Sequence, residues 1–160
     1  MSLTIRKKML IRTHLAIAVF FILLFLPSVS SKIIFSAVVL AATFLPDLDS
    51  AFSTIGKFKV SRVMQLFIKH RGFLHSFTLC IIVSIILAFF LPVLSLGFFL
   101  GYSLHLLEDS FSINGIRFFW PLKKTSSGWL RTGSLFETNL FIIFILVDLI
   151  VFMIMMKRVF

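Results

Sequence analysis

The sequence Lys69-His70-Arg71-Gly72-Phe73-Leu74-His75-Ser76 stands at the start of an apolar run that reaches Leu91. It places two of the chain's four histidines beside an arginine, at the point where a polar connection meets the run. Because Gly72 accepts many backbone conformations, we expect a helix to begin between the two histidines. His70 would then lie on the incoming loop and His75 in the first turn. The stretch therefore predicts a polar site at one end of an apolar helix.

The rest of the chain is strongly apolar. Its 160 residues are 59% hydrophobic and only 14% charged, with a mean hydropathy of +1.10. Soluble domains carry about a quarter charged residues, so the composition excludes an ordinary soluble globule. It predicts one all-α domain, a polytopic membrane helix bundle with four or five spans. The apolar segments cover about residues 9–26, 31–45, 72–91, 93–107 and 135–156.

The positive charges predict the orientation of the bundle. Lysine and arginine number 16 against six acids. The N-terminal tail and the connections 51–71 and 110–134 hold four, five and four of them. The positive-inside rule places these parts, and the N-terminus, in the cytoplasm. Because this rule accounts for the excess of positive charge, we expect membrane lipids as partners and do not expect nucleic acid. Lys157 and Arg158 would fall on the opposite side if the last segment crosses, which is an exception to the rule. The exception would disappear if that segment did not fully cross.

In this orientation the histidines and several acids lie together at the cytoplasmic ends of the apolar segments. Mixed imidazole and carboxylate ligands suit zinc, manganese or iron rather than calcium. We therefore expect one or two divalent transition-metal ions at this face, most simply zinc. The expected ligands are His14, Asp47, His70, His75, His105 and Asp109.

Each part of this set also has a simpler explanation. His105 and Asp109, four residues apart, share one helix face, which suits metal ligation or a hydrogen bond within the helix. Asp47 and Asp49 follow a helix end, where carboxylates are unfavourable without a nearby cation, but they could also be solvated loop residues. The planar fork of Arg71 suits a phosphate or simple anchoring. The convergence of all these residues on one face favours the metal site.

Two further features stand outside this set. Residues 115–121 are rich in aromatic side chains, which is typical of an interfacial anchor or of the mouth of a lipid-facing site. Asp148 lies about 20 Å along the last segment from Leu135, at about 1.5 Å per residue. That is too deep to join the metal site, so we expect a neutral Asp148 paired with a polar group on another helix.

The order and spacing of the motifs resemble those of the YdjM-like family of predicted inner-membrane, metal-dependent hydrolases. The motifs are His14, Leu45-Pro46-Asp47-Leu48-Asp49, His70-Arg71-Gly72-Phe73-Leu74-His75-Ser76, Gly101-Tyr102-Ser103-Leu104-His105-Leu106-Leu107-Glu108-Asp109 and Gly115-Ile116-Arg117-Phe118-Phe119-Trp120-Pro121. The resemblance implies a multi-pass membrane protein with metal-binding hydrolase chemistry. The pattern of His105 and Asp109 is also distantly similar to the helical zinc phospholipase C and P1 nuclease enzymes.

These observations together predict a membrane-bound, metal-dependent hydrolase of a phosphoester, with a membrane lipid as the candidate substrate. A bound metal would supply a water with a pKa lowered towards 7. Asp49 is the candidate general base, and Arg71 is the candidate group that stabilises developing charge. The alternative is a metal or ion transporter, or a metal-stabilised structural membrane protein. A transporter needs polar groups through the bilayer, whereas the first four segments have theirs at one end, which favours the enzyme.

Overall fold

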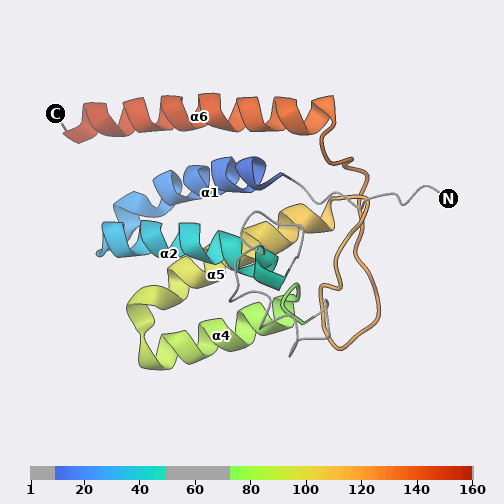
Figure 1. Cartoon of the computed structure of the whole chain (residues 1–160). Coiled ribbons are helices and arrows are strands. Elements are labelled where there is room, and N and C mark those ends of the chain that lie inside the picture. Colours follow the sequence, from blue (N-terminus) through green and yellow to red (C-terminus); the bar gives the residue numbers. More distant parts are fainter. Residues whose placement is uncertain (1–9, 50–72, 160) are drawn as a thin grey trace.

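The computed structural model describes residues 10–49 and 73–159, in which helices are joined by turns and loops (Figure 1). The expected all-α class is confirmed for this part of the chain. The elements are α1 (Ile11–Phe25), η1 (Leu26–Ser28), α2 (Lys32–Phe44), η2 (Leu45–Asp49), α4 (Phe77–Phe90), α5 (Pro92–Ser110) and α6 (Leu135–Val159), where η marks a 3₁₀ turn. Between α5 and α6 a long loop carries two isolated β-bridges.

Two of the described helical stretches are long and apolar enough to cross a bilayer, namely Ile11–Ser28 and Leu135–Lys157. The other apolar helices are short, with 13 residues in α2 and 14 in α4, where a span normally needs about 20. The expectation of four or five spans is therefore supported for two of them. Helix α5 has 19 residues, but its last turns are polar and it is not among the stretches that are both long and apolar enough.

The helix α4 begins at Phe77, later than Gly72, where the sequence predicted a start. Ser76 is its N-cap, and the Ser76 hydroxyl accepts a hydrogen bond from the backbone N–H of Leu79 at 3.3 Å. The same hydroxyl donates to the carbonyl of Phe73 at 2.6 Å. A serine satisfies an orphan N–H of the first turn, which glycine cannot do with its side chain. His75 therefore lies in a turn before the helix and not in its first turn.

Two glycines let α5 lie unusually close to α2. A Cβ atom on Gly101 would stand 2.2 Å from the carbonyl oxygen of Val39, and one on Gly97 would stand 3.1 Å from that of Phe35. Small residues four apart allow two helix backbones to approach in this way. Thr43 lies in the same interface and donates to the Val39 carbonyl at 2.9 Å. Since η2 continues directly from α2, this packing brings η2 against the last turns of α5.

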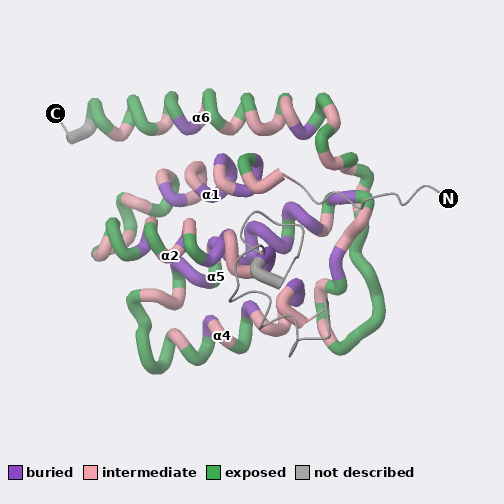
Figure 2. The backbone as a smooth tube through the Cα atoms, in the orientation of Figure 1, coloured by how far each residue is buried: buried purple, intermediate pink, exposed green. Residues whose placement is uncertain are grey.

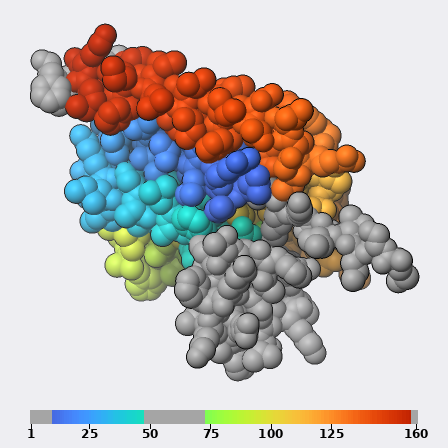
Figure 3. All heavy atoms as spheres, turned by 45° about the horizontal axis from the view of Figure 1, so that its top comes forward, coloured from blue at the N-terminus to red at the C-terminus, as the bar shows by residue number. Residues whose placement is uncertain are grey.

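The helices differ greatly in how far they are buried (Figure 2). Ten residues of α5 are buried, including its polar last turns. Helix α1 lies between α2 and α6, and α6 packs on α1 along the outside of the molecule (Figures 1 and 3). The fold thus places α5 at the centre and α6 at the periphery.

Candidate metal centre

Five of the expected ligands come together from four separate parts of the chain. His14 lies in the first turns of α1, Asp47 in η2, His75 in the turn before α4, and His105 with Asp109 in the last turns of α5. All five are buried, with exposed fractions from 0% for His105 to 8% for Asp47. The convergence that the sequence predicted from one membrane face is thus present among these residues.

Four donor atoms face one another at the centre of this group. Nε2 of His75 lies 3.6 Å from Oδ1 of Asp47 and 3.7 Å from Oδ2 of Asp109. Nε2 of His105 lies 3.9 Å and 3.7 Å from the same two oxygens. Four ligands around one zinc ion at its usual bond lengths would be about 3.3–3.6 Å apart. Small inward movements of the side chains would therefore close this set on a metal ion.

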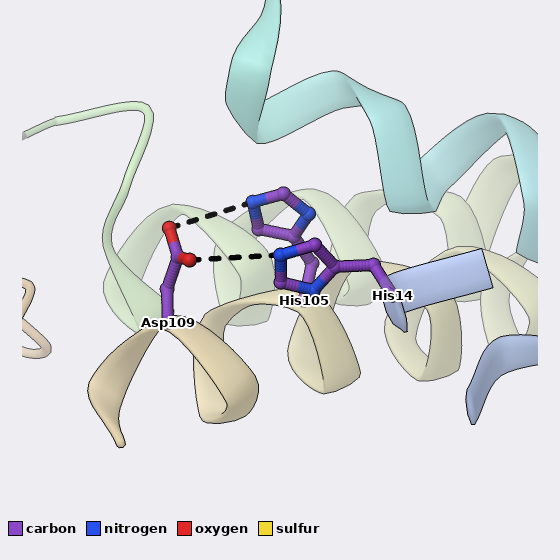
Figure 4. A group of neighbouring side chains, drawn as sticks. All are labelled: His14, His105 and Asp109. Carbon is purple, nitrogen blue, oxygen red and sulfur yellow. Dashed lines mark ion pairs between the residues drawn. The ribbon is translucent and has the colours of Figure 1, made fainter. Parts of the chain in front are cut away.

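The two oxygens of Asp109 face different histidines (Figure 4). Oδ2 points towards His105 and His75, whereas Oδ1 lies 3.6 Å from Nε2 of His14. The rings of His14 and His105 are stacked, with centroids 4.2 Å apart and planes at 14°. Potential ligand atoms therefore form two overlapping groups, one of His14, His105 and Asp109 and one of Asp47, His75 and His105. A carboxylate with this orientation can serve either one ion or a pair.

The His105 ring supports a metal as the missing partner of this cluster. Within residues 10–49 and 73–159, neither nitrogen of this fully buried ring has a hydrogen-bond partner. Burying such a polar group without a partner costs about 1–3 kcal/mol. A divalent ion accepts the lone pair of a neutral imidazole. The residues present therefore fit a bound transition metal.

The turn that carries His75 is held against α5 by specific contacts. The hydroxyl of Tyr102, one turn before His105, donates to the backbone carbonyl of Leu74. The backbone N–H of Phe77 donates to the carbonyl of Phe118 at 2.7 Å, and the rings of these two residues stack. The aromatic residues at 115–121 thus pack on the start of α4. They therefore support the turn with His75, whereas the interfacial role expected of them stays a prediction.

One buried acid at the site had no role assigned from the sequence. Glu108 is 7% exposed, and its Oε2 lies 2.9 Å from Nδ1 of His14. Burial raises the pKa of this carboxyl, and the charge of His14 opposes that effect. The available signal was the scarcity of acids, because Glu108 is one of only six. Its position beside Asp109 gave no indication of which helix it would face.

Three expected site residues are not placed by the structure. His70 and Arg71 lie outside the described residues. Asp49 ends η2, two residues from Asp47, but its side chain is likewise outside what is described. Their roles as ligand, charge stabiliser and base stay predictions.

The expectation of a polar partner for Asp148 is wrong for the described part of the chain. Asp148 lies outside the metal groups, as expected, and is 7% exposed. It lines a groove of about 460 Å³ between α1 and α6, whose other walls are mostly apolar. Neither of its carboxylate oxygens has a hydrogen-bond partner among the described residues. Apart from Arg12, the residues of α1 that line this groove are apolar, namely Leu15, Ala16, Val19 and Leu23.

Comparison with known proteins gives a family and one relative. A family model described as YdjM inner membrane protein matches residues 9–159. A protein of Bacillus subtilis (strain 168), named Uncharacterized protein YvsG, is 31% identical over 114 residues, covering 64% of this chain and 71% of that protein. No solved structure matches.

Proposed function

The chain belongs to the YdjM inner membrane protein family, and within that family we propose that it is a metal-dependent hydrolase of a phosphoester. The observation that carries the proposal is the buried cluster of three histidines and two aspartates from four parts of the chain. Donor atoms 3.6–3.9 Å apart, in a chain with only four histidines, are unusual unless they share a ligand. The mixed donor set favours zinc, with manganese or iron as the alternatives.

In this proposal the protein's own residues hold and orient the metal. Asp47, His75 and His105 form one side, and Asp109 links them to His14. A bound ion would supply an activated water and would stabilise negative charge on a phosphoryl oxygen. The burial of the cluster excludes bulk water, which strengthens each of these interactions. Asp49 and Arg71, which are close in sequence to Asp47 and His75, remain the candidates for proton acceptor and charge stabiliser.

The proposed substrate is a membrane lipid phosphoester. His14 lies in the first turns of α1, which begins the stretch Ile11–Ser28, one of the two that are long and apolar enough to cross a bilayer. A site at the end of such a helix meets the headgroup region, where phosphoesters are concentrated. The positive-inside pattern places this end in the cytoplasm. In a Cys80→Ala background, Lys124→Cys should react with a membrane-impermeant thiol reagent only after the cells are opened; reaction in intact cells would reverse the orientation.

The test of the hydrolase is made on metal-loaded protein in nanodiscs, with panels of phospholipids and polyprenyl phosphates. Asp49→Asn should keep the metal and lower turnover by about 10²- to 10⁴-fold, because the amide cannot accept the proton. Asp47→Asn should lose metal and turnover together. If both variants lose metal, Asp49 is a ligand and not a base. If metal-loaded wild type cleaves nothing in the panel but carries metal across liposome membranes, the transporter explanation replaces the hydrolase.

A further inference from the structure

The ring of His14 lies between two consecutive carboxylates of α5. Its Nδ1 is 2.9 Å from Oε2 of Glu108, and its Nε2 is 3.6 Å from Oδ1 of Asp109. The two nitrogens stand on different edges of the imidazole, so each faces one acid. His14 and Glu108 are both buried, with exposed fractions of 1% and 7%. Solvent therefore has little access to either contact.

The shorter contact is an ion pair that lacks hydrogen-bond geometry, because neither Nδ1 of His14 nor Oε2 of Glu108 has a hydrogen-bond partner among the described residues. A small turn of either side chain would direct a hydrogen on Nδ1 at the carboxylate. A nitrogen lone pair and a carboxylate oxygen repel each other at 2.9 Å unless a hydrogen lies between them. A neutral imidazole carries its hydrogen on one nitrogen and its lone pair on the other. With the hydrogen on Nδ1 and directed at Glu108, the lone pair on Nε2 points towards Asp109 and the metal cluster. Histidine ligands commonly donate their second N–H to a carboxylate in this way, which fixes the ring and its tautomer.

We propose that Glu108 is a positioning residue that holds the proton on Nδ1 of His14 and so makes Nε2 the ligand atom of that histidine. This inference rests on the metal site of the proposed function and names a residue to which that function assigned nothing. Glu108 acts through His14 and contributes no ligand atom itself, since it contacts Nδ1 of the ring and not the Nε2 that faces Asp109. It also links α1 to α5, the helix that carries both His105 and Asp109.

The arrangement explains how α1 contributes a ligand at all. Helix α1 packs mainly against α6 and α2 and makes fewer contacts with α5. The ring of His14 connects α1 to α5 at the site by stacking on His105 and by its contacts with Glu108 and Asp109. Without Glu108, the ring could turn about its side-chain torsions or change tautomer. Either change would withdraw Nε2 from the cluster.

The experiment measures Co²⁺ affinity by competition with a chelator, on the full chain in detergent or nanodiscs. Glu108→Leu keeps the volume and removes the acceptor, and should weaken binding about 10- to 100-fold. Glu108→Gln keeps an acceptor oxygen and should bind close to the wild type. In a His14→Ala background Glu108→Leu should have no further effect. Asp148→Asn, which changes a buried carboxylate outside the site, is the matched control and should leave affinity unchanged.

A second readout identifies the tautomer directly. Nitrogen-15 NMR of histidine-labelled protein, with the His14 signal assigned by its loss in His14→Ala, should show protonated Nδ1 in the wild type and in Glu108→Gln. In Glu108→Leu the signal should shift towards the other tautomer or a mixture. A merely structural contact would change stability without moving this signature.

Several results would overturn the inference. One is a wild type in which His14 carries its proton on Nε2. Another is a Glu108→Leu variant with unchanged Co²⁺ affinity. The third is an equal loss of Co²⁺ affinity from Glu108→Leu in the wild type and in the His14→Ala background, since Glu108 would then act independently of His14. A wild type that binds no Co²⁺ would disprove both the metal site and this inference. If Glu108 and His14 have coupled effects on Co²⁺ binding but no phosphoester is cleaved, the proposed hydrolase function is disproved and the role of Glu108 is supported.

Discussion

Helices α5 and α6 are both apolar, but the protein uses them in opposite ways. Helix α5 buries ten of its 19 residues, and its last turns hold His105, Glu108 and Asp109. Helix α6, with 25 residues, is the longer and more apolar, yet its buried residues among those described are only Glu137 and Asp148. Figure 2 shows this contrast along the two tubes. Hydrophobicity therefore does not indicate which helix forms the core when lipid is the surrounding solvent.

The two acids of α6 sharpen the contrast. Glu137 accepts hydrogen bonds from the backbone N–H of Leu10 at 2.6 Å and from that of Gly133 at 2.5 Å. Asp148 faces an apolar groove with no hydrogen-bond partner in the described chain. Glu137 thus ties α6 to the start of α1, one turn before His14, whereas Asp148 is buried without a hydrogen bond to any described residue. We therefore expect α6 to affect the metal cluster only through the placement of α1.

The largest expected effect is at the polar end of α5. His105→Ala removes the side chain that belongs to both groups of potential ligands. We expect it to lower metal affinity by more than the roughly 10- to 100-fold typical of residues that only orient a ligand. Elemental analysis and chelator competition on purified protein measure this loss. A variant that keeps full zinc, manganese or iron occupancy would show that the cluster is not a metal site.

The next effect concerns the close packing of α5. Gly101→Val places a side chain where a Cβ would already stand 2.2 Å from the Val39 carbonyl oxygen. We expect it to lower the free energy of unfolding by about 1–3 kcal/mol, because α5 must move away from α2. Thermal unfolding in detergent measures it. Gly97→Ala, at 3.1 Å, is the graded control, and equal losses in the two variants would contradict the close approach at Gly101.

A smaller effect on stability is expected at Glu137, the acid of α6 whose carboxylate accepts two hydrogen bonds. Glu137→Gln keeps one acceptor oxygen but turns an amide N–H₂ towards a backbone N–H. One buried donor is then unsatisfied, which costs about 1 kcal/mol or somewhat more. Thermal unfolding should show the loss, and metal affinity should fall with it, since Leu10 leads into α1. Unchanged unfolding would mean that α6 does not hold the start of α1.

The smallest effect is expected at Asp148. Asp148→Leu replaces a buried carboxyl without partners by an apolar side chain in an apolar groove. We expect no loss of stability and a gain of up to about 1 kcal/mol. Thermal unfolding of this variant beside Glu137→Leu, which should be clearly destabilised, makes the comparison within one helix. A strong loss in Asp148→Leu would reveal a partner that the described residues do not include.

The sequence alone was sufficient for the helical class and for most of the cluster. Helix ends follow from local chemistry, such as Pro46 after α2 and Pro92 at the start of α5, because proline constrains its own backbone and its neighbours. Histidines and acids are rare and costly in apolar segments, so their gathering at segment ends was informative by itself. That reasoning identified His14, Asp47, His75, His105 and Asp109 as one group.

Only the tertiary structure decided which atoms meet. Spacing along one helix relates His105 to Asp109, but no local rule says that the His14 ring stacks on His105 or that Nδ1 faces Glu108. Those contacts depend on how closely α5 approaches α2 at Gly101 and on where α1 is held by Glu137, which are contacts between residues far apart in the chain. The difference between Glu137, which accepts two hydrogen bonds, and Asp148, which has no hydrogen-bond partner among the described residues, has the same cause. An acid is stabilised by the donors that neighbouring elements present, and the sequence of its own helix does not contain them.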